Sequence, residues 1–449
     1  MWELQALEYK RLAFMSSPNK ISLLRTAGLT SPRPIFWGWY VVFSSFTILV
    51  LVYGARYSFG VFVRPMFAEY NWPMTVISLA ASINLLMYAS AGIFTGWLLD
   101  RLAPKLITTI GILMTTAGFI SAGFVKTPMG LYLAYGILVG LGTAGCGAVA
   151  FTAAIGKWFI KKRGIALGIA SMGIGVGTML MAPLAGYIVG KFGWRAGFLC
   201  IGGLICLVGI TFSQVFMGKD NPQHYGLLPD GDLASPDPSS KVPASAALAK
   251  PSLKPVISDH RFWLLTICNV FAVMTLMMTF VHQVAYATNN GIDKIEAAAA
   301  IGLIGITGSG GKFFFGWLSD RINDAKYSAA LGFLIMAIGM FLLYRSDNVI
   351  ILYTFALIYG FGYGSLAPVT PYLIADRFGG QVLGSAYGLC IFFSAGVGGA
   401  LGPIIGGIIF DQTGSYRPGW IINIICLLMI SMLILALKPN SEHQRTRTP

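Results

Sequence analysis

The chain has 449 residues, of which 56% are hydrophobic and only 11% are charged. Because about a quarter of the residues in soluble domains are charged, this composition excludes an ordinary soluble protein and indicates an integral membrane protein. The formal net charge of +14 does not indicate a nucleic-acid partner, since the basic residues form no stripe with interleaved aromatic side chains.

The first 35 residues mix charged residues with short apolar pieces. They lack the compact apolar core and the adjacent small-residue cleavage site of a signal peptide. We therefore expect residues 1–35 to form an N-terminal tail rather than a targeting segment.

Twelve uncharged runs dominate the rest of the chain. A transmembrane helix needs about 20 apolar residues to cross about 30 Å of hydrocarbon, and most of the runs reach that length. Such long runs do not match the short alternating strands of a membrane barrel. The sequence predicts an all-α membrane protein with twelve transmembrane helices, in the runs 37–55, 74–99, 106–125, 127–156, 164–190, 196–218, 262–292, 297–311, 327–344, 348–375, 378–410 and 418–437.

The basic residues are distributed unequally between the two sides that these helices define. With the N-terminus inside, 22 of the 31 Lys and Arg residues fall in the tails and the even-numbered loops, 7 in the odd-numbered loops and 2 within helices. Cytoplasmic loops of membrane proteins carry such an excess of positive charge. We therefore expect a protein of the plasma (inner) membrane with both termini in the cytoplasm. The net positive charge of the chain reflects this topology.

A stretch rich in Pro, Ser, Ala and Lys at 219–260 separates two six-helix halves, at 36–218 and 261–437. We interpret it as a cytoplasmic linker, and residues 438–449 as a cytoplasmic C-terminal tail. The halves resemble each other: "GWLLDR" at 96–101 returns as "GWLSDR" at 316–321, and the same offset of 220 relates Gly164 to Gly384 and Pro183 to Pro403. Paired repeats of this kind occur in transporters, with the substrate site between the halves near mid-membrane.

These motifs resemble the major facilitator superfamily, over about residues 36–437. The signature of its loop between helices 2 and 3 matches Gly96, Asp100, Arg101 and Lys105, and a weaker second copy matches Gly316, Asp320 and Arg321. In this loop Pro104 stands where the family usually has glycine. "RYSFGVFVRP" in helix 1, "FVHQVAYATNNGI" in helix 7 and "LGSAYGLCIFFSAGVGGALGP" in helix 11 resemble the branch of monocarboxylate transporters and oxalate:formate antiporters.

The resemblance implies a major facilitator fold that rocks between two states. Asp100, Arg101, Asp320 and Arg321 would then form cytoplasmic contacts that gate the transport path. Glycine pairs spaced four residues apart, Gly173 with Gly177, Gly384 with Gly388, Gly398 with Gly402 and Gly402 with Gly406, predict close helix packing between the halves.

Two cations interrupt otherwise uncharged helices. Lys312 lies eight residues before Asp320, and Arg56 lies eight residues before Arg64, which places each about 12 Å from the nearer helix end. The resembling transporters carry a cation at the position of Lys312, and those coupled to protons have an aspartate four residues earlier, where this chain has Gly308. The helices contain no Asp or Glu to neutralise either cation, so we expect an anionic substrate to bind between them.

Polar residues within the spans could complete this site. Any one of them is more often a helix-packing residue than a ligand contact. His282 and Lys312 are the candidates for carrying a proton. The polar candidates are Tyr57, Asn84, Tyr88, Asn269, His282, Gln283, Tyr387 and Ser394.

Together these features predict a secondary active transporter of a small organic anion. The candidate substrates are mono- or dicarboxylates such as lactate, pyruvate, formate or oxalate, moved by proton symport or by anion exchange. An exporter of drugs or other amphiphilic metabolites is the alternative with the same fold, and an anion receptor is a third possibility. The spans contain no carboxylate pair, no His/Cys cluster and no Ser/His/Asp set, so we expect no enzyme, no metal and no cofactor. We expect a monomer in the lipid bilayer.

Overall fold

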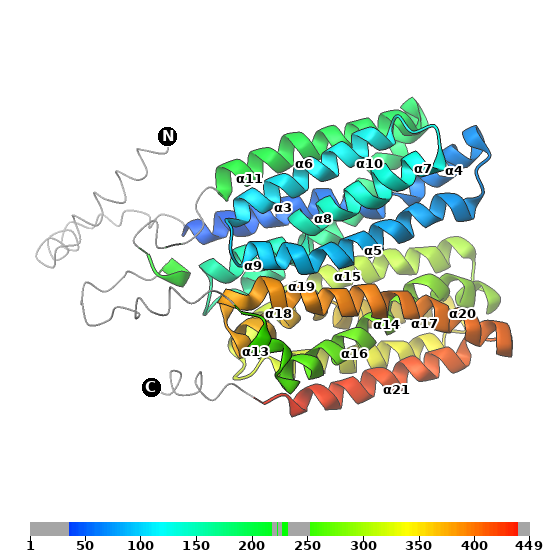
Figure 1. Ribbon diagram of the computed structural model, residues 1–449. Helices are drawn as coiled ribbons and strands as arrows, with labels where there is room; N and C mark the ends of the chain where they lie inside the picture. The colour runs from blue at the N-terminus through cyan, green and yellow to red at the C-terminus, as the bar shows by residue number, and fades with distance from the viewer. Residues whose placement is uncertain (1–35, 218–221, 223–226, 232–251, 439–449) are drawn as a thin grey trace, which may run out of the picture.

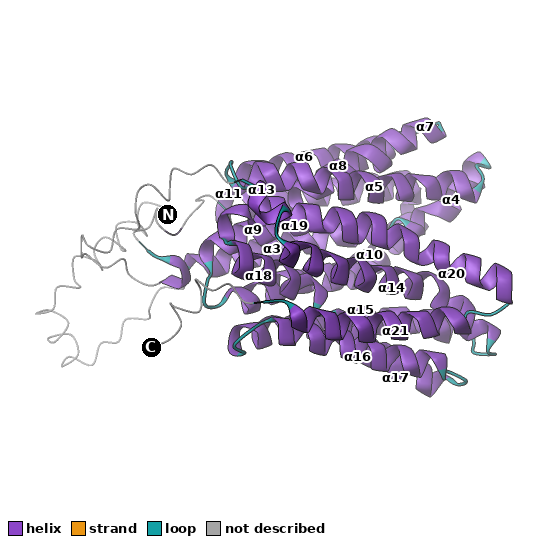
Figure 2. Cartoon of the chain, turned by 60° about the horizontal axis from the view of Figure 1, so that its bottom comes forward, coloured by secondary structure: helices purple, strands orange, loops and turns teal. Residues whose placement is uncertain are grey.

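The computed structural model describes residues 36–217, 222, 227–231 and 252–438. Both predicted tails, apart from Lys438, and most of the predicted linker lie outside these residues. The elements of the described part are helices, and Figure 2 shows that the long ones run side by side with their axes roughly aligned.

The first half of the chain forms one bundle. Its helices are α3 (Trp37–Tyr57), α4 (Gly60–Tyr70), α5 (Met74–Leu99), α6 (Pro104–Ala122), α7 (Pro128–Leu131), η1 (Tyr132–Val139), α8 (Gly140–Cys146), α9 (Ala148–Trp158), α10 (Arg163–Leu204), η2 (Ile205–Gly209) and α11 (Ile210–Phe216). Pro104 stands in the first turn of α6, where its missing N–H has no intrahelical partner to lose. The departure from the family's loop pattern therefore starts a helix here.

The second half forms the other bundle. Its helices are α14 (His260–Asn289), α15 (Lys294–Arg321), α16 (Lys326–Tyr344), α17 (Val349–Tyr363), α18 (Leu366–Phe378), α19 (Leu383–Ile391), η7 (Phe392–Gly398), α20 (Gly399–Thr413), α21 (Arg417–Leu433) and η8 (Ile434–Ala436). Three short elements precede or separate these helices: η4 (Pro229–Gly231), α13 (Lys254–Ile257) and η6 (Gly380–Val382). In Figure 1 the first bundle, blue to green, lies above the second, green to red.

Eleven segments of the described chain are long and apolar enough to cross a membrane. One of them, 163–216, has 54 residues, and an unbroken helix of that length would extend about 80 Å, far more than a bilayer. Gly193 breaks it with a φ of +84°, a value that glycine adopts without strain. This segment therefore supplies two crossings, and the predicted fold with twelve transmembrane helices in two halves is confirmed.

The two bundles touch where glycines let backbones meet. A Cβ atom at Gly96 would lie 2.1 Å from the carbonyl oxygen of Gly384, and one at Gly164 would lie 2.1 Å from that of Gly316. These contacts join α5 to α19 and α10 to α15, each pair containing one helix from each half. The beginning of α3 and the end of α21 lie on the same side of the molecule (Figure 1). The contacts between the bundles form on this side, which we call the predicted cytoplasmic side.

The expectation that all four glycine pairs pack between the halves is wrong for three of them. Gly173 and Gly177 lie against carbonyl oxygens of α3, within the first half. Gly398 and Gly402 lie against carbonyl oxygens of α14, and Gly406 lies against His282 of α14, within the second half. The four-residue spacing allows close approach but does not select the partner helix.

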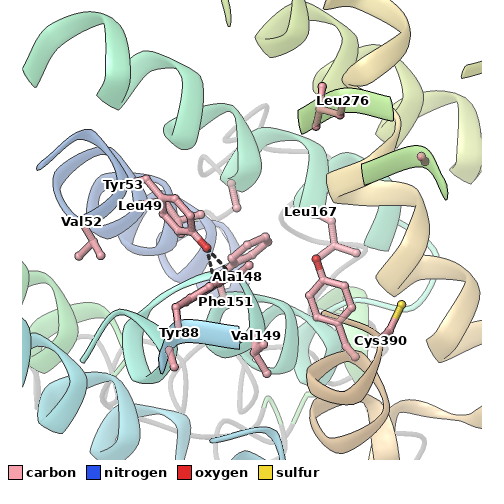
Figure 3. Packing of buried hydrophobic residues seen from close by; sticks show 14 of the residues in the cluster. Leu49, Val52, Tyr53, Tyr88, Ala148, Val149, Phe151, Leu167, Leu276 and Cys390 are labelled. Carbon is pink, nitrogen blue, oxygen red and sulfur yellow. Dashed lines mark hydrogen bonds between the residues drawn. The ribbon is translucent and has the colours of Figure 1, made fainter. Parts of the chain in front are cut away.

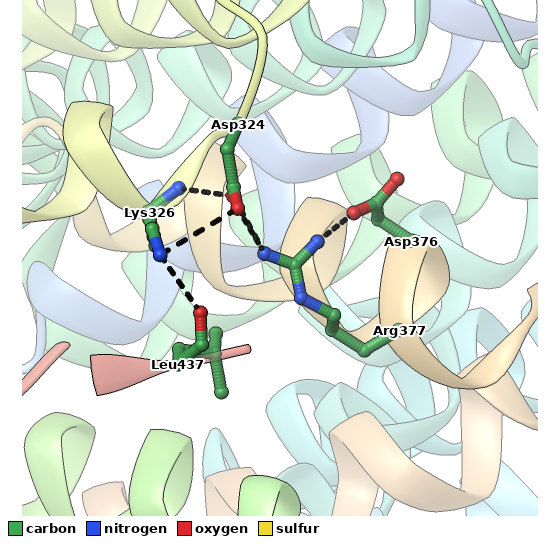
Figure 4. A network of polar contacts seen from close by, with 5 residues as sticks. All are labelled: Asp324, Lys326, Asp376, Arg377 and Leu437. Carbon is green, nitrogen blue, oxygen red and sulfur yellow. Dashed lines mark hydrogen bonds and ion pairs between the residues drawn. The ribbon is translucent and has the colours of Figure 1, made fainter. Parts of the chain in front are cut away.

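An ionic network ties the predicted cytoplasmic ends of the second half together (Figure 4). The buried guanidinium of Arg377, at the end of α18, donates to both oxygens of Asp324 at 2.6 and 2.7 Å and also pairs with Asp376. Lys326, near the same Asp324, donates to the carbonyl oxygen of Leu437 at 3.1 Å. These charges are paired within one bundle and therefore differ from the two cations of the spans.

Candidate functional site

A cavity of about 360 Å³ lies between the two halves. Its walls come from α3 and α10 of the first half and from α14, α15 and α17 of the second. Most of the lining is aromatic or aliphatic. The lining residues are Tyr57, Ile174, Gly175, Thr178, Met277, Phe280, Ile301, Gly305, Lys312 and Tyr363.

Among the residues of the described part of the chain that line the cavity, Lys312 is the one charged residue. Its side chain is buried, with 1% of the residue exposed, and within the described part of the chain it has no ion-pair or hydrogen-bond partner. An ammonium group in a membrane-spanning helix is costly unless it faces a cavity or a partner. Its backbone lies at the contact between the halves, where a Cβ at Gly168 would lie 2.6 Å from the carbonyl oxygen of Lys312.

The ring of Tyr363 is the neighbour that the Lys312 ammonium meets instead of a carboxylate. The Nζ atom lies 4.9 Å from the ring centroid, within the range of a cation–π interaction. The same ring explains Gly308: a Cβ atom there would lie 2.9 Å from Cδ1 of Tyr363. Tyr363 therefore fills the space that an aspartate at position 308 would need.

Arg56, the second cation of the spans, is buried and held by neutral groups of its own half. Its Nε donates to Oδ1 of Asn84 at 2.7 Å, and its guanidinium carbon lies 4.5 Å from the centroid of the Tyr88 ring. The amide of Asn84 in turn donates to the carbonyl oxygen of Tyr135 at 2.9 Å. Arg56 forms no ion pair with a described residue, and it is not among the residues that line the cavity.

Tyr88 is fixed by a hydrogen bond to Tyr53, with 2.8 Å between the two hydroxyl oxygens. The Tyr53 hydroxyl also accepts from the N–H of Ala148 at 3.3 Å, which links α3, α5 and α9 (Figure 3). Asn84 and Tyr88 thus form a shell around Arg56, whereas Tyr57, which is 54% exposed, lines the cavity.

The structure places the other polar candidates in helix-packing contacts. Asn269 bonds Thr370 and the Leu265 carbonyl, and Gln283 donates to the Ala297 carbonyl. Ser394 of η7 donates to the carbonyl oxygen of Cys390, four residues earlier in the adjoining α19.

His282 and Tyr387 also lie away from the cavity lining. A ring nitrogen of His282 lies 2.9 Å from the Pro403 carbonyl oxygen, and the ring packs beside Tyr416. Tyr387 is buried on α19. Of the two candidates for carrying a proton, only Lys312 lines the cavity.

Asp100 connects the two halves on the predicted cytoplasmic side. Its carboxylate accepts hydrogen bonds from the backbone N–H groups of Gly384 and Ser385, both at 2.8 Å. These N–H groups belong to the first turn of α19 and have no intrahelical partner. Burial raises the pKa of Asp100 above its ordinary value, although the N–H groups and nearby Lys157 oppose the rise.

Asp320 makes the equivalent contact in the other direction. It accepts from the N–H groups of Gly164 and Ile165 in the first turn of α10, both at 2.7 Å. Each half therefore caps a helix of the opposite half, and both caps must open if the halves separate on this side.

The two arginines of the loop signature do not pair with these aspartates. The guanidinium carbon of Arg101 lies 3.9 Å from the Trp97 ring, and that of Arg321 lies 5.0 Å from the Trp317 ring. Each arginine thus stacks on an aromatic residue four positions earlier in the chain. The hydrogen bonds that join the two halves here run from backbone amides to the carboxylates of Asp100 and Asp320.

Sequence reasoning did not identify the apolar walls of the cavity. Ile174, Met277, Phe280, Ile301 and Tyr363 line it, but such residues occur throughout the spans. No spacing distinguishes a residue that faces the cavity from one that faces lipid. What these residues share is a place on helices near Lys312, and only the three-dimensional structure shows it.

Two six-helix halves around a central cavity, with a cation that has no carboxylate partner among the described residues, define a membrane transporter. Comparison with known proteins agrees: the family model described as "Major Facilitator Superfamily" matches residues 45–395 and 274–449. The chain belongs to this superfamily. The prediction of a transporter rather than an enzyme is confirmed, because the relatives compared are transporters.

Relatives of known name lie in the predicted branch. The chain is 27% identical to Monocarboxylate transporter 12 of Mus musculus, over 94% of this chain and 89% of the relative. It is 26% identical to Monocarboxylate transporter 13 of Rattus norvegicus, over 91% of this chain and 90% of the relative. The predicted resemblance to the monocarboxylate transporters is thereby confirmed.

Solved structures share the fold. FucP in the outward conformation has a TM-score of 0.68 and 14% identity, with 90% of this chain and 99% of that chain covered. The human organic anion transporter MFSD10 has a TM-score of 0.65 and 15% identity, with 88% and 99% covered. At these identities the similarity concerns the fold alone.

Proposed function

We propose that this protein is a secondary active transporter that carries a small organic anion by alternating access. One observation carries the proposal: the buried ammonium of Lys312 lines the cavity between the halves without a carboxylate partner among the described residues. A substrate carboxylate would neutralise that charge at low dielectric. The names of the relatives, monocarboxylate transporters 12 and 13, agree with an anionic substrate of this kind.

The number of cations at the cavity favours a monocarboxylate. Lys312 lines the cavity, whereas Arg56 is engaged by Asn84 and Tyr88. One ammonium group neutralises one carboxylate, so pyruvate, lactate or formate fits this arrangement better than oxalate does. In this proposal Arg56 fixes the arrangement of α3 and α5, and the hydroxyl of Tyr57 is available as a hydrogen-bond donor to the substrate.

Proton symport and anion exchange make different use of Lys312. The described residues that line the cavity include no carboxylate, so a co-transported proton would travel on the Lys312 amine or on the substrate itself. In exchange, the ammonium would remain charged and one anion would replace another. Substrate-dependent proton uptake into proteoliposomes separates the two mechanisms, because exchange of two monoanions moves no net proton.

Alternating access would operate through the two aspartate caps. With Asp100 and Asp320 engaged, the predicted cytoplasmic side is closed and the substrate enters from the opposite side. Opening toward the cytoplasm would break both caps. The excess of Lys and Arg in the tails and even-numbered loops supports this orientation, with both termini in the cytoplasm.

Uptake of labelled lactate, pyruvate, formate and oxalate into proteoliposomes tests the proposal. Lys312→Gln should reduce uptake at least about tenfold, because a neutral amide cannot replace the lost charge interaction. Lys312→Arg should retain part of the activity. The control is Lys191→Gln, which removes an exposed lysine outside the cavity lining. Undiminished carboxylate uptake by a folded Lys312→Gln variant would refute the anion site.

A further inference from the structure

We infer that the transported anion is a monocarboxylate with a bulky apolar tail, preferably aromatic. This inference rests on the proposed function and names the substrate class of the same site. It starts from a contrast within the cavity: the one charged group, Lys312, lies among walls formed mainly by hydrocarbon and aromatic side chains.

The cavity extends along α15 away from its charged end. Ile301, Gly305 and Lys312 are spaced by four and seven residues, so they lie on one face of the helix. Lys312 lies eleven residues after Ile301, which corresponds to about 16 Å along the helix. A carboxylate held by Lys312 therefore leaves most of this length to the rest of the substrate. A two- or three-carbon acid would fill only the charged end.

The volume leads to the same conclusion. About 360 Å³ is many times the space that a single water molecule needs. If the substrate were a small acid, the remaining space would hold water against Ile174, Met277 and Ile301, which offer it no hydrogen bonds. An apolar tail that displaces this water gains free energy in proportion to the hydrocarbon area that it covers.

An aromatic corner lies next to the charged end. The ring centroids of Phe280 and Tyr363 are 6.2 Å apart with an interplanar angle of 81°, an edge-to-face arrangement. Tyr363 is also the ring that lies 4.9 Å from the Lys312 Nζ atom. A substrate whose carboxylate meets Lys312 therefore places its next few carbon atoms beside Phe280 and Tyr363, where an aryl group finds two aromatic partners.

Gly305 leaves space along this path, whereas Gly175 brings the opposite half close to α15. A Cβ atom at Gly305 would meet no other atom within 4 Å, so the glycine leaves space on the wall of the cavity. Gly175 belongs to α10, on the opposite half, and faces Ser309 of α15. The cavity is therefore narrow between the halves and long along α15, which suits a flat ring better than a branched polar group.

A matched pair of acids tests the inference. Phenylpyruvate and pyruvate share the 2-oxo acid group and differ by one phenyl ring. In proteoliposomes loaded for counterflow, phenylpyruvate should inhibit labelled pyruvate uptake with an inhibition constant about tenfold or more below that of unlabelled pyruvate. Phe280→Ala should reduce this ratio to less than about threefold. Phe313→Ala, at an exposed phenylalanine next to Lys312 that is not among the lining residues, is the control and should keep the full ratio.

The outcomes separate this inference from the proposed function. Equal inhibition by the two acids, or stronger inhibition by pyruvate, with uptake that still depends on Lys312, would overturn the apolar-tail inference and leave the anion transporter in place. Absence of binding and uptake for both acids would overturn both. A preference for phenylpyruvate that survives Phe280→Ala but is lost in Phe313→Ala would contradict the assigned aromatic corner.

Discussion

Asp100 and Asp320 occupy equivalent positions in the two halves, 220 residues apart, and each caps a helix that belongs to the other half. Asp100 accepts from the N–H of Gly384, and Asp320 accepts from the N–H of Gly164, which is again 220 residues from Gly384. The repeat seen in the sequence is therefore also a reciprocal contact. Four hydrogen bonds from backbone amides to carboxylates join the two halves on the predicted cytoplasmic side.

Removal of either carboxylate should open this side. Asp100→Ala leaves two N–H groups at a helix N-terminus without their acceptor. This should destabilise the closed state relative to the open state by about 1–2 kcal/mol. Spin labels at the exposed positions Leu102 and Gln381, one in each half, should report a larger fraction of long distances. Asp347→Ala, at an exposed carboxylate far from this contact, is the control. Unchanged distances would contradict a gating role for Asp100.

Lowering the pH should favour the state in which the predicted cytoplasmic side is closed, because Asp100 binds a proton more tightly in that state. Burial raises the pKa of this carboxyl in the closed state, whereas in an open, solvated state it would be near the ordinary value of about 3.9. The closed state therefore binds the proton more tightly. As the pH falls through the raised pKa toward the ordinary value, the closed population should increase. The same label pair measures this change, and the Asp100→Asn background should lose the part of the pH response that Asp100 causes.

Glycine at position 316 should be required for closure. A Cβ atom there would lie 2.3 Å from the carbonyl oxygen of Gly164, and a backbone atom cannot move aside as a flexible side chain can. Gly316→Ala should separate α15 from α10 and lengthen the distance between labels at Lys162 and Asn323. Gly310→Ala is the matched control on the same helix, because its Cβ would meet nothing within 4 Å. Equal distances in the two variants would exclude the steric explanation.

Asp230, in the predicted linker, stabilises the loop directly before α10. The carboxylate of Asp230 accepts hydrogen bonds from the N–H groups of Ile160, Lys161 and Lys162, at 2.8 to 3.0 Å, directly before α10 begins. Asp230→Ala should lower the free energy of local opening by about 1 kcal/mol. Hydrogen exchange of these amides should therefore become about fivefold faster. Mass spectrometry of the peptide that contains them measures the change. Asp230→Asn, which keeps one acceptor oxygen in place, should show a smaller effect, and equal rates in wild type and Asp230→Ala would contradict the cap.

Arg56 and Asn84 should be energetically coupled. Asn84→Leu leaves the buried Arg56 without its hydrogen-bond acceptor, and this should lower stability by about 2–3 kcal/mol. Arg56→Met in the same background removes the buried charge and should restore part of the loss. Thermal unfolding of the purified protein in detergent gives the double-mutant cycle. Additive effects of the two substitutions would show that the contact does not stabilise the fold.

The sequence by itself determined the class of fold and the position of the central charge. Uncharged runs of about 20 residues can satisfy their backbone amides in lipid only as helices, so their number predicted the twelve crossings without reference to tertiary contacts. Lys312 stood out for the same reason: a cation in such a run is costly, so its environment must be special. The offset of 220 residues likewise predicted two equivalent halves.

Only the tertiary structure decided which residues surround that charge. A helix presents side chains in all directions, and in a membrane the lipid-facing and cavity-facing residues are both apolar, so hydrophobic periodicity cannot separate Phe280 of the cavity wall from exposed Phe313. For the same reason the sequence grouped Arg56 with Lys312, although Asn84 and Tyr88 hold Arg56 within its own half. The contacts that make the difference join residues far apart in the chain, and they are fixed by helix packing rather than by local pattern.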